Sequence, residues 1–202
     1  MVAAASSDQD ARNEELTESV LAVLAEIGYA RASLPEILSR PEFEAGIPVA
    51  YFDDKVDVVI RCITHYKARC VHRYDDVVAR SITANELVEG FAAKLGETIR
   101  EEAPMHRLWY DVRSQSMFEP RLREVATRID RSLAEMVWRV VDRYAELAGR
   151  PPIADHSTAV YGMLDGLFQQ ALLAYADSDE QVLDGLAEQV RELMPLLLKP
   201  AG

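Results

Sequence analysis

The sequence has few of the residues that interrupt helices or cross-link chains. Its 202 residues include nine glycines, nine prolines and two cysteines, and 49% are hydrophobic. This composition is ample for one large or two small packed cores. Cys62 and Cys70 lie eight residues apart on one expected helix, too far for a disulfide, and two cysteines imply no disulfide framework.

Long hydrophobic runs are also absent. No stretch approaches the roughly 20 apolar residues needed to span a bilayer, so we expect no membrane association. The first fifteen residues lack the basic start and apolar stretch of a signal peptide. A soluble, cytoplasmic protein is therefore expected.

Positive charge is scarce. The net charge is −12, and the first 67 residues hold twelve acidic and six basic side chains. A domain that binds duplex DNA is usually basic on its working face, so this one would need its few cations gathered there. Charge alone does not exclude DNA binding, but it argues against a strongly basic DNA-binding domain.

Motifs of catalysis are missing as well. We find no phosphate-binding loop, no Gly-x-Ser-x-Gly elbow, no dinucleotide fingerprint and no paired-histidine metal signature. Cys62, His65, Cys70 and His72 share one expected helix but lack the spacing of a closed zinc site. We expect no enzyme, no cofactor and no metal. A small-molecule binder or an enzyme remains an alternative to a regulatory protein.

Helical periodicity dominates what is present. Apolar residues recur three and four apart along most of the chain, which indicates amphipathic helices. The spacing predicts about nine helices and an all-α fold, with one uninterrupted helix over 54–80 and a break at Pro104. The expected segments are 10–27, 34–40, 44–50, 54–80, a helix capped by Thr83 or Asn85, a helix opened by Pro104, 120–147, 155–175 and 178–198.

The stretch from Gly28 to Lys55 predicts two short helices with a tight connection. Ser33 and Glu36 form a capping box that starts a helix at Leu34. Pro41 predicts that this helix ends just before it. A second helical segment follows over 44–50. Asp53 is a plausible N-cap for the next helix. This order is typical of a helix-turn-helix DNA reader.

At these residues the chain resembles the tetracycline-repressor (TetR) family of bacterial regulators. The match runs without a gap through Gly28-Tyr29, Ser33, Ile37, Gly46, Tyr51-Phe52 and Lys55. The resemblance implies a three-helix helix-turn-helix head over 1–54 and a helical ligand-binding and dimerisation domain over 55–202. It implies a ligand-responsive DNA-binding transcriptional regulator, a repressor, with double-stranded DNA as partner. The DNA-contacting residues that it implies are Arg31, Ser33, Arg40, Gly46, Ile47, Val49, Tyr51 and Lys55.

The recognition segment departs from the family pattern. Pro48 falls about four residues into the expected recognition helix, where it removes an N–H and crowds the preceding turn. Glu42 and Glu44 place carboxylates where a duplex presents phosphates. Together with Pro41 they favour an alternative: a small-molecule-binding or protein-interaction regulator of the same fold with degraded DNA recognition.

Aromatic and methionine side chains gather in the middle of the chain. One interpretation is an ordinary helix-interface core. The other is that some line a cavity for a small apolar or aromatic effector, with Arg113, His106 or Tyr66 as polar anchors. The candidate ligand-binding residues are Tyr66, Phe91, Met105, Trp109, Arg113, Met117, Phe118 and Met136.

The last two expected helices form an apolar hairpin. The run Tyr161 to Ala171, with Gly162 and Gly166 four residues apart, is similar to the penultimate helix of TetR proteins. In that family two such hairpins form a four-helix dimer interface, so we expect a symmetric homodimer. The alternative is that both helices are internal. The candidate interface residues are Tyr161, Leu164, Gly166, Leu167, Val182, Leu186, Val190 and Leu193.

Overall fold

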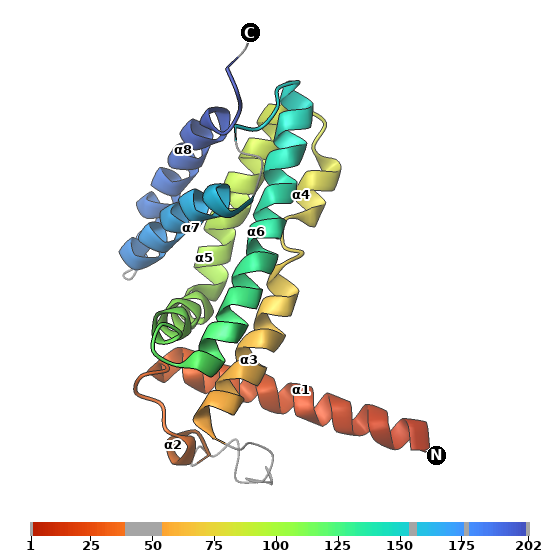
Figure 1. Ribbon diagram of the computed structural model, residues 1–202, viewed down its shortest axis with the longest axis vertical. Coiled ribbons are helices and arrows are strands. Elements are labelled where there is room, and N and C mark those ends of the chain that lie inside the picture. The colour runs from red at the N-terminus through yellow and green to blue at the C-terminus, as the bar shows by residue number, and fades with distance from the viewer. Residues whose placement is uncertain (1, 39–53, 154–156, 176–177, 201–202) are drawn as a thin grey trace. The chain divides into compact units, whose positions relative to one another are not determined.

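The computed structural model describes residues 2–38, 54–153, 157–175 and 178–200, and describes the side chains from Glu14 onward except that of Leu38. This part of the chain forms eight helices and no extended strand, which confirms the all-α class (Figure 1). The predicted recognition helix over 44–50 lies outside the described residues. The helices are α1 (Val2–Ile27), α2 (Leu34–Leu38), α3 (Lys55–Cys70), α4 (Asp75–Arg80), α5 (Ala84–Gln115), α6 (Pro120–Ala148), α7 (Ser157–Ala174) and α8 (Glu180–Leu196).

The chain divides into two compact units. Unit 1 comprises residues 1–68 and 104–127, and unit 2 comprises residues 69–103 and 128–202. Helices α3, α5 and α6 each contribute residues to both units. The predicted boundary at residues 54/55 therefore does not coincide with this division, because α3 up to Ala68 belongs with the helices before it.

Unit 1 is built on the packing of α1, α2 and α3. Gly28, with a φ of 79°, ends α1 in the left-handed conformation that favours glycine. The amide of Glu36 donates to the Ser33 hydroxyl at 3.2 Å, so α2 begins at Leu34 as predicted. The Cys62 thiol of α3 donates to the Thr17 carbonyl of α1 at 3.7 Å. The buried side chains of these helices include Val20, Leu21, Leu24, Ile37, Val58, Val59 and Ile63.

The predicted uninterrupted helix over 54–80 is wrong. The helix stops at Cys70, and a turn of four residues precedes α4. Within the turn the Arg73 amide donates to the Cys70 carbonyl, and the His72 imidazole contacts the Asp75 carboxylate at 2.7 Å. The guanidinium of Arg139 in α6 binds the same carboxylate and the Val71 carbonyl. Contacts to a distant helix therefore stabilise a break that neither proline nor glycine marks.

Helix α5 bends where the sequence predicted a break. Glu102 has a non-helical φ of −128° and ψ of 21°, and Pro104 follows two residues later. Because proline has no N–H and its ring crowds the preceding turn, the helical hydrogen bonding is interrupted there. The helix resumes after the kink and runs to Gln115, so α5 contains two helical segments that meet at the predicted break.

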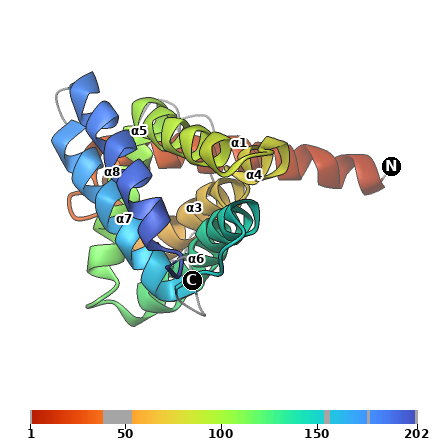
Figure 2. The same cartoon turned by 90° about the horizontal axis from the view of Figure 1, so that it is seen from above.

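Unit 2 contains α4, α7 and α8 with parts of α5 and α6. Helices α7 and α8 pack side by side in both views (Figures 1 and 2). Arg100 and Glu89 of α5 form bidentate pairs with Glu180 and Arg191 of α8, respectively. None of the helices in the described part of the chain is both long and apolar enough to cross a bilayer.

Candidate functional site

Most of the predicted DNA contacts cannot be placed. Arg40, Gly46, Ile47, Val49 and Tyr51 lie outside the described residues. Two others are on the surface: Arg31 is exposed, and so is Ser33, whose hydroxyl accepts the α2 capping bond.

Lys55, the last predicted DNA contact, is held against the protein itself. Its ammonium lies 4.1 Å from the centre of the Tyr29 ring, a cation–π contact. Partial burial lowers the pKa of Lys55, and the nearby Asp111 carboxylate opposes that shift. Burial, with help from Glu119 and other carboxylates, raises the pKa of Tyr29. Lys55 therefore presents only part of its charge to solvent.

The turn that follows α1 is anchored to α5. The Asp111 carboxylate accepts hydrogen bonds from the backbone amides of Tyr29, at 2.7 Å, and Ala30, at 3.4 Å. A Cβ on Gly28 would lie 3.2 Å from the same carboxylate oxygen, so glycine also permits this close approach. The start of the predicted helix-turn-helix region is thus held by one carboxylate of α5, about eighty residues further along the chain.

The start of α3 is anchored to α6. The Asp54 side chain accepts from the Asp57 amide at 2.9 Å and so caps α3, the role that the sequence assigned to Asp53. Arg121, in the first turn of α6, binds the Asp54 carboxylate with two hydrogen bonds, at 2.6 and 3.1 Å. The Arg121 hydrogen bond and then the Asp57 amide hold the pKa of Asp54 below its usual value.

A buried aromatic and cationic cluster, which we call the lysine cluster, lies deeper in unit 1. It consists of Tyr66 and Lys67 of α3 with His106 and Trp109 of α5. The Lys67 ammonium lies 4.8 Å from the Trp109 ring and 5.2 Å from the Tyr66 ring. The Tyr66 and His106 rings meet edge-on with centroids 6.0 Å apart. Sequence reasoning missed Lys67, although its place in the apolar spacing of Ile63, Tyr66 and Cys70 was a usable signal.

The structure brings only part of the predicted ligand set together. Tyr66 and Trp109 belong to the lysine cluster, whereas Phe91 packs edge-on against Tyr74 in unit 2, with centroids 4.8 Å apart. Met136 is buried in unit 2, and Met105 and Arg113 are half-buried in unit 1.

Met117 and Phe118, two of the predicted ligand-binding residues, lie on the surface. They are 65% and 82% exposed, because α5 ends at Gln115 and the turn before α6 carries both to the surface. The Arg123 guanidinium donates to the Ser116 and Met117 carbonyls and so stabilises that turn.

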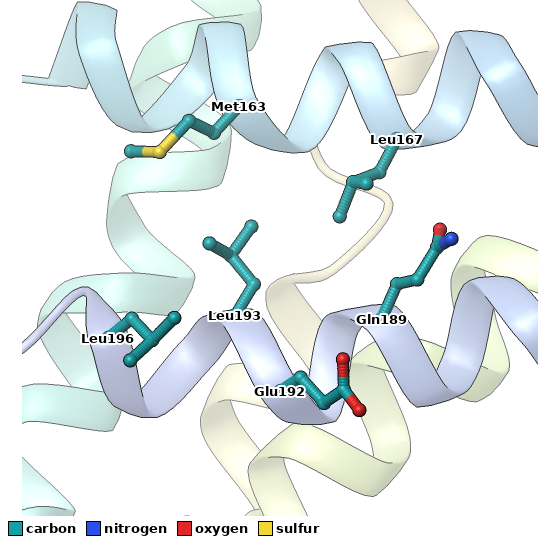
Figure 3. Close-up of a pocket in the computed structure, with 6 residues that line it drawn as sticks. All are labelled: Met163, Leu167, Gln189, Glu192, Leu193 and Leu196. Carbon is teal, nitrogen blue, oxygen red and sulfur yellow. The ribbon is translucent and has the colours of Figure 1, made fainter.

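The outer face of the α7–α8 hairpin carries an open apolar groove of about 360 Å³. Its lining side chains come from both helices, with Leu167 of α7 pointing toward α8 and Leu193 of α8 pointing toward α7 (Figure 3). Leu196 at the end of the groove is 69% exposed. We call this surface the hairpin groove; its lining residues are Met163, Leu167, Gln189, Glu192, Leu193 and Leu196.

Half of the predicted dimer-interface residues face the interior of unit 2 and not the hairpin groove. Tyr161, Leu164, Leu186 and Val190 are buried in the described chain itself, and the Tyr161 hydroxyl bonds Asp130 at 3.0 Å. They cannot form an outer face because they fill the interior of unit 2. Leu167 and Leu193 line the hairpin groove, and Gly166 and Val182 are partly exposed.

The residues considered for a metal do not assemble into a site. In the described part of the chain, no group of three or more His, Cys, Asp or Glu side chains is placed to hold a metal ion. Cys62 is buried and donates to a backbone carbonyl, and burial raises the pKa of its thiol to about 12.

The all-α fold, the short helix after a glycine turn and the terminal helix hairpin are the arrangement that the resemblance to TetR-type transcriptional regulators implies. A family model described as "BetI-type transcriptional repressor, C-terminal" matches residues 84–195. The chain belongs to this BetI-type branch of the TetR family of transcriptional regulators.

Named relatives agree with the family. The HTH-type transcriptional regulator BetI of Burkholderia thailandensis is 27% identical over 200 residues, covering 95% of this chain and 96% of the relative. Two solved structures share the fold. A TetR-family regulator from Mesorhizobium loti has a TM-score of 0.71 at 13% identity, covering 95% of this chain and 98% of that one. FadR from Bacillus subtilis, in complex with stearoyl-CoA, has a TM-score of 0.67 at 18% identity, covering 90% and 97%.

Proposed function

We propose that this regulator is a homodimeric repressor that binds double-stranded DNA through residues 1–54 and leaves it when a small effector binds. The observation that carries the proposal is the pair of anchors in unit 1. One segment, residues 104–127, holds the turn after α1 through Asp111 and the start of α3 through Arg121. The helix-turn-helix region lies between these two points in the sequence.

The anchors supply a route from ligand to DNA. A ligand that displaces the 104–127 segment moves both anchors together, because Asp111 and Arg121 both belong to that segment. In a dimer this movement changes the spacing of two heads, which must match half-sites about one helical turn apart. Ligand and DNA then oppose one another through a coupling free energy that acts in both directions.

The nature of the effector follows from the interior of the protein. Aromatic side chains in the lysine cluster suit a small apolar or aromatic molecule. The complex of FadR with stearoyl-CoA supports small-molecule binding by this fold. We further infer a cytoplasmic protein without catalytic activity.

The direct test is a gel shift with DNA from upstream of the gene that encodes the chain, repeated over a range of salt concentrations. We expect specific binding at low salt. The logarithm of the binding constant should fall linearly with the logarithm of the salt concentration. Matched DNA of scrambled sequence is the control. Absence of any specific complex at the lowest salt would overturn the proposal.

Lys55 supports a second candidate, a regulator with degraded DNA recognition. Its ammonium is engaged with Tyr29, and the first 67 residues carry twice as many acidic as basic side chains. Under this alternative, ligand binding raises the melting temperature of the protein although no duplex is bound specifically. The gel shift therefore separates the two candidates.

A further inference from the structure

We propose that the Tyr29 ring holds the Lys55 ammonium against the protein, away from DNA phosphates, and so keeps the non-specific DNA affinity of the chain low. We call this contact the Tyr29 restraint. The inference rests on the proposed function, since it concerns how the same region meets the DNA backbone. Phosphate contacts carry no sequence information, so weakening them favours specific over non-specific sites.

Positive charge is scarce around the helix-turn-helix region. The described part of residues 28–61 holds three cationic side chains, those of Arg31, Lys55 and Arg61. Arg61 donates to the Asp57 carboxylate at 3.1 Å, so part of its charge is compensated within α3. Each cation that reaches a phosphate adds to non-specific affinity by releasing counterions. The placement of a single lysine therefore matters more here than in a strongly basic domain.

Lys55 is held by contacts within unit 1. Its side chain is half-buried, and its ammonium lies 4.1 Å from the centre of the Tyr29 ring. An aromatic face attracts a cation, and the attraction strengthens where water is partly excluded. The Asp111 carboxylate also stabilises the charged ammonium, and a phosphate that approached Lys55 would be repelled by it. Transfer of the ammonium to DNA is therefore opposed by both neighbours.

The ring that holds the lysine has a fixed backbone. The Tyr29 amide donates to the Asp111 carboxylate at 2.7 Å, and Gly28 directly before it has the left-handed conformation that ends α1. Tyr29 is half-buried, and burial raises the pKa of its hydroxyl, so the side chain is a neutral phenol at physiological pH. The start of α3 thus has an anchored aromatic partner for its lysine.

The test measures binding of the full chain to a fluorescent duplex of scrambled sequence over a range of salt concentrations. Tyr29→Leu removes the ring, and Tyr29→Phe keeps it. We expect Tyr29→Leu to bind severalfold more tightly at low salt. Its plot of log K against log salt should be steeper by about 0.9 per protomer, the increment for one further phosphate contact. Tyr29→Phe should match the wild type.

Substitution of Lys55 shows whether the gain comes from this lysine. In the Tyr29→Leu background, Lys55→Met should abolish the gain, a dependence that general loosening of the fold would not produce. In the wild type, Lys55→Met should change the slope no more than Lys94→Met, which removes a lysine from unit 2.

Circular dichroism checks that each variant folds. If Tyr29→Leu does not fold, Lys55→Met alone decides. A slope reduced by about 0.9 per protomer would then show that the wild-type lysine already contacts a phosphate.

A measurement without DNA reports the contact itself. Reductive methylation with isotope-labelled formaldehyde labels lysine side chains for NMR and keeps their positive charge. Methyl groups over an aromatic face resonate upfield. The signal that Lys55→Met removes should therefore lie upfield in the wild type and in Tyr29→Phe, and move downfield in Tyr29→Leu.

Three outcomes would overturn the inference: Tyr29→Leu binds the scrambled duplex like the wild type, Lys55→Met flattens the wild-type slope, or the Lys55 signal does not depend on the ring. None of them concerns sequence preference, so the inference can fail while the specific complex in the gel shift stands. Conversely, equal binding of upstream and scrambled DNA would refute the proposed function and leave a measured effect of Tyr29 on the salt slope intact.

Discussion

Arg121 holds Asp54 by both of its carboxylate oxygens, and Asp54 in turn caps α3. Asp54 therefore fixes the start of α3, and its partner Arg121 belongs to the first turn of α6. The two functions of Asp54, capping and ion pairing, can be separated by substitution.

Asparagine at position 54 can still cap a helix but cannot form the ion pair. We expect melting temperatures to fall in the order wild type, Asp54→Asn, Asp54→Ala, with a small first step because exposed ion pairs contribute little. Arg121→Gln should match Asp54→Asn. The double variant Asp54→Asn/Arg121→Gln should lose nothing further, and additive losses would show that the two residues act independently.

Asp111→Ala removes the acceptor for two backbone amides, those of Tyr29 and Ala30. Because Tyr29 is partly buried and Ala30 is exposed, water can replace the carboxylate, and the loss should be about 0.5–1.5 kcal/mol. For a chain of this size the melting temperature should then fall by roughly 1–6 °C. Asp142→Ala, at an exposed position of α6, is the matched control. A melting temperature for Asp111→Ala equal to that of the control would contradict the anchor.

The limits of sequence reasoning are clearest at α3 and α4. Local signals worked: the Ser33 cap of α2 and the glycine turn at Gly28 are where they were expected. The break after Cys70 was missed because helical apolar spacing continues through it. It is stabilised by Arg139, more than sixty residues away, and no local pattern reports such a contact.

The candidate sites show the same division. The burial of Lys67 was not predicted, because it depends on packing against Trp109 of α5, which no local pattern reports. The faces of α7 were misassigned because that helix is apolar over most of its surface, so periodicity could not distinguish the inner side of Leu164 from the outer side of Met163.

The hairpin groove yields a test of the dimer. A glutamate at Met163 or Leu196 would place a charge within an apolar interface between two copies, where an unpaired buried charge is costly. We expect Met163→Glu and Leu196→Glu to sediment as monomers where the wild type sediments as a dimer. Ile82→Glu, at an apolar residue 76% exposed outside the hairpin, should remain dimeric. If all three variants remained dimeric, the dimer interface would not include the hairpin groove.

Cys62 and Cys70 should be inert in the folded protein. Both side chains are buried, and the raised pKa of Cys62 leaves almost no thiolate at neutral pH. Ellman's reagent should label neither thiol within minutes in native buffer and both in guanidinium chloride. Ser114→Cys, at an exposed position of α5, provides the positive control. Fast labelling of the wild type would mean that unit 1, which holds Cys62, or unit 2, which holds Cys70, opens readily.

The two ion pairs that join α5 to α8 should make stability depend on acid. Arg191 holds the pKa of Glu89 below its usual 4.5, and Arg100 does the same for Glu180. A depressed carboxylate pKa adds stability that is complete well above pH 4.5 and is lost as pH falls through the lowered value.

Replacing both arginines by glutamine removes this contribution. The variant Arg100→Gln/Arg191→Gln should therefore melt below the wild type at pH 7, and the two should converge as pH falls through the lowered pKa values of Glu89 and Glu180. Melting curves from pH 7 to pH 3, followed by circular dichroism, measure the difference. Because all four side chains are exposed, the gap at pH 7 should shrink in high salt. A gap that persisted in acid would assign the loss to packing of the arginine side chains instead of to charge.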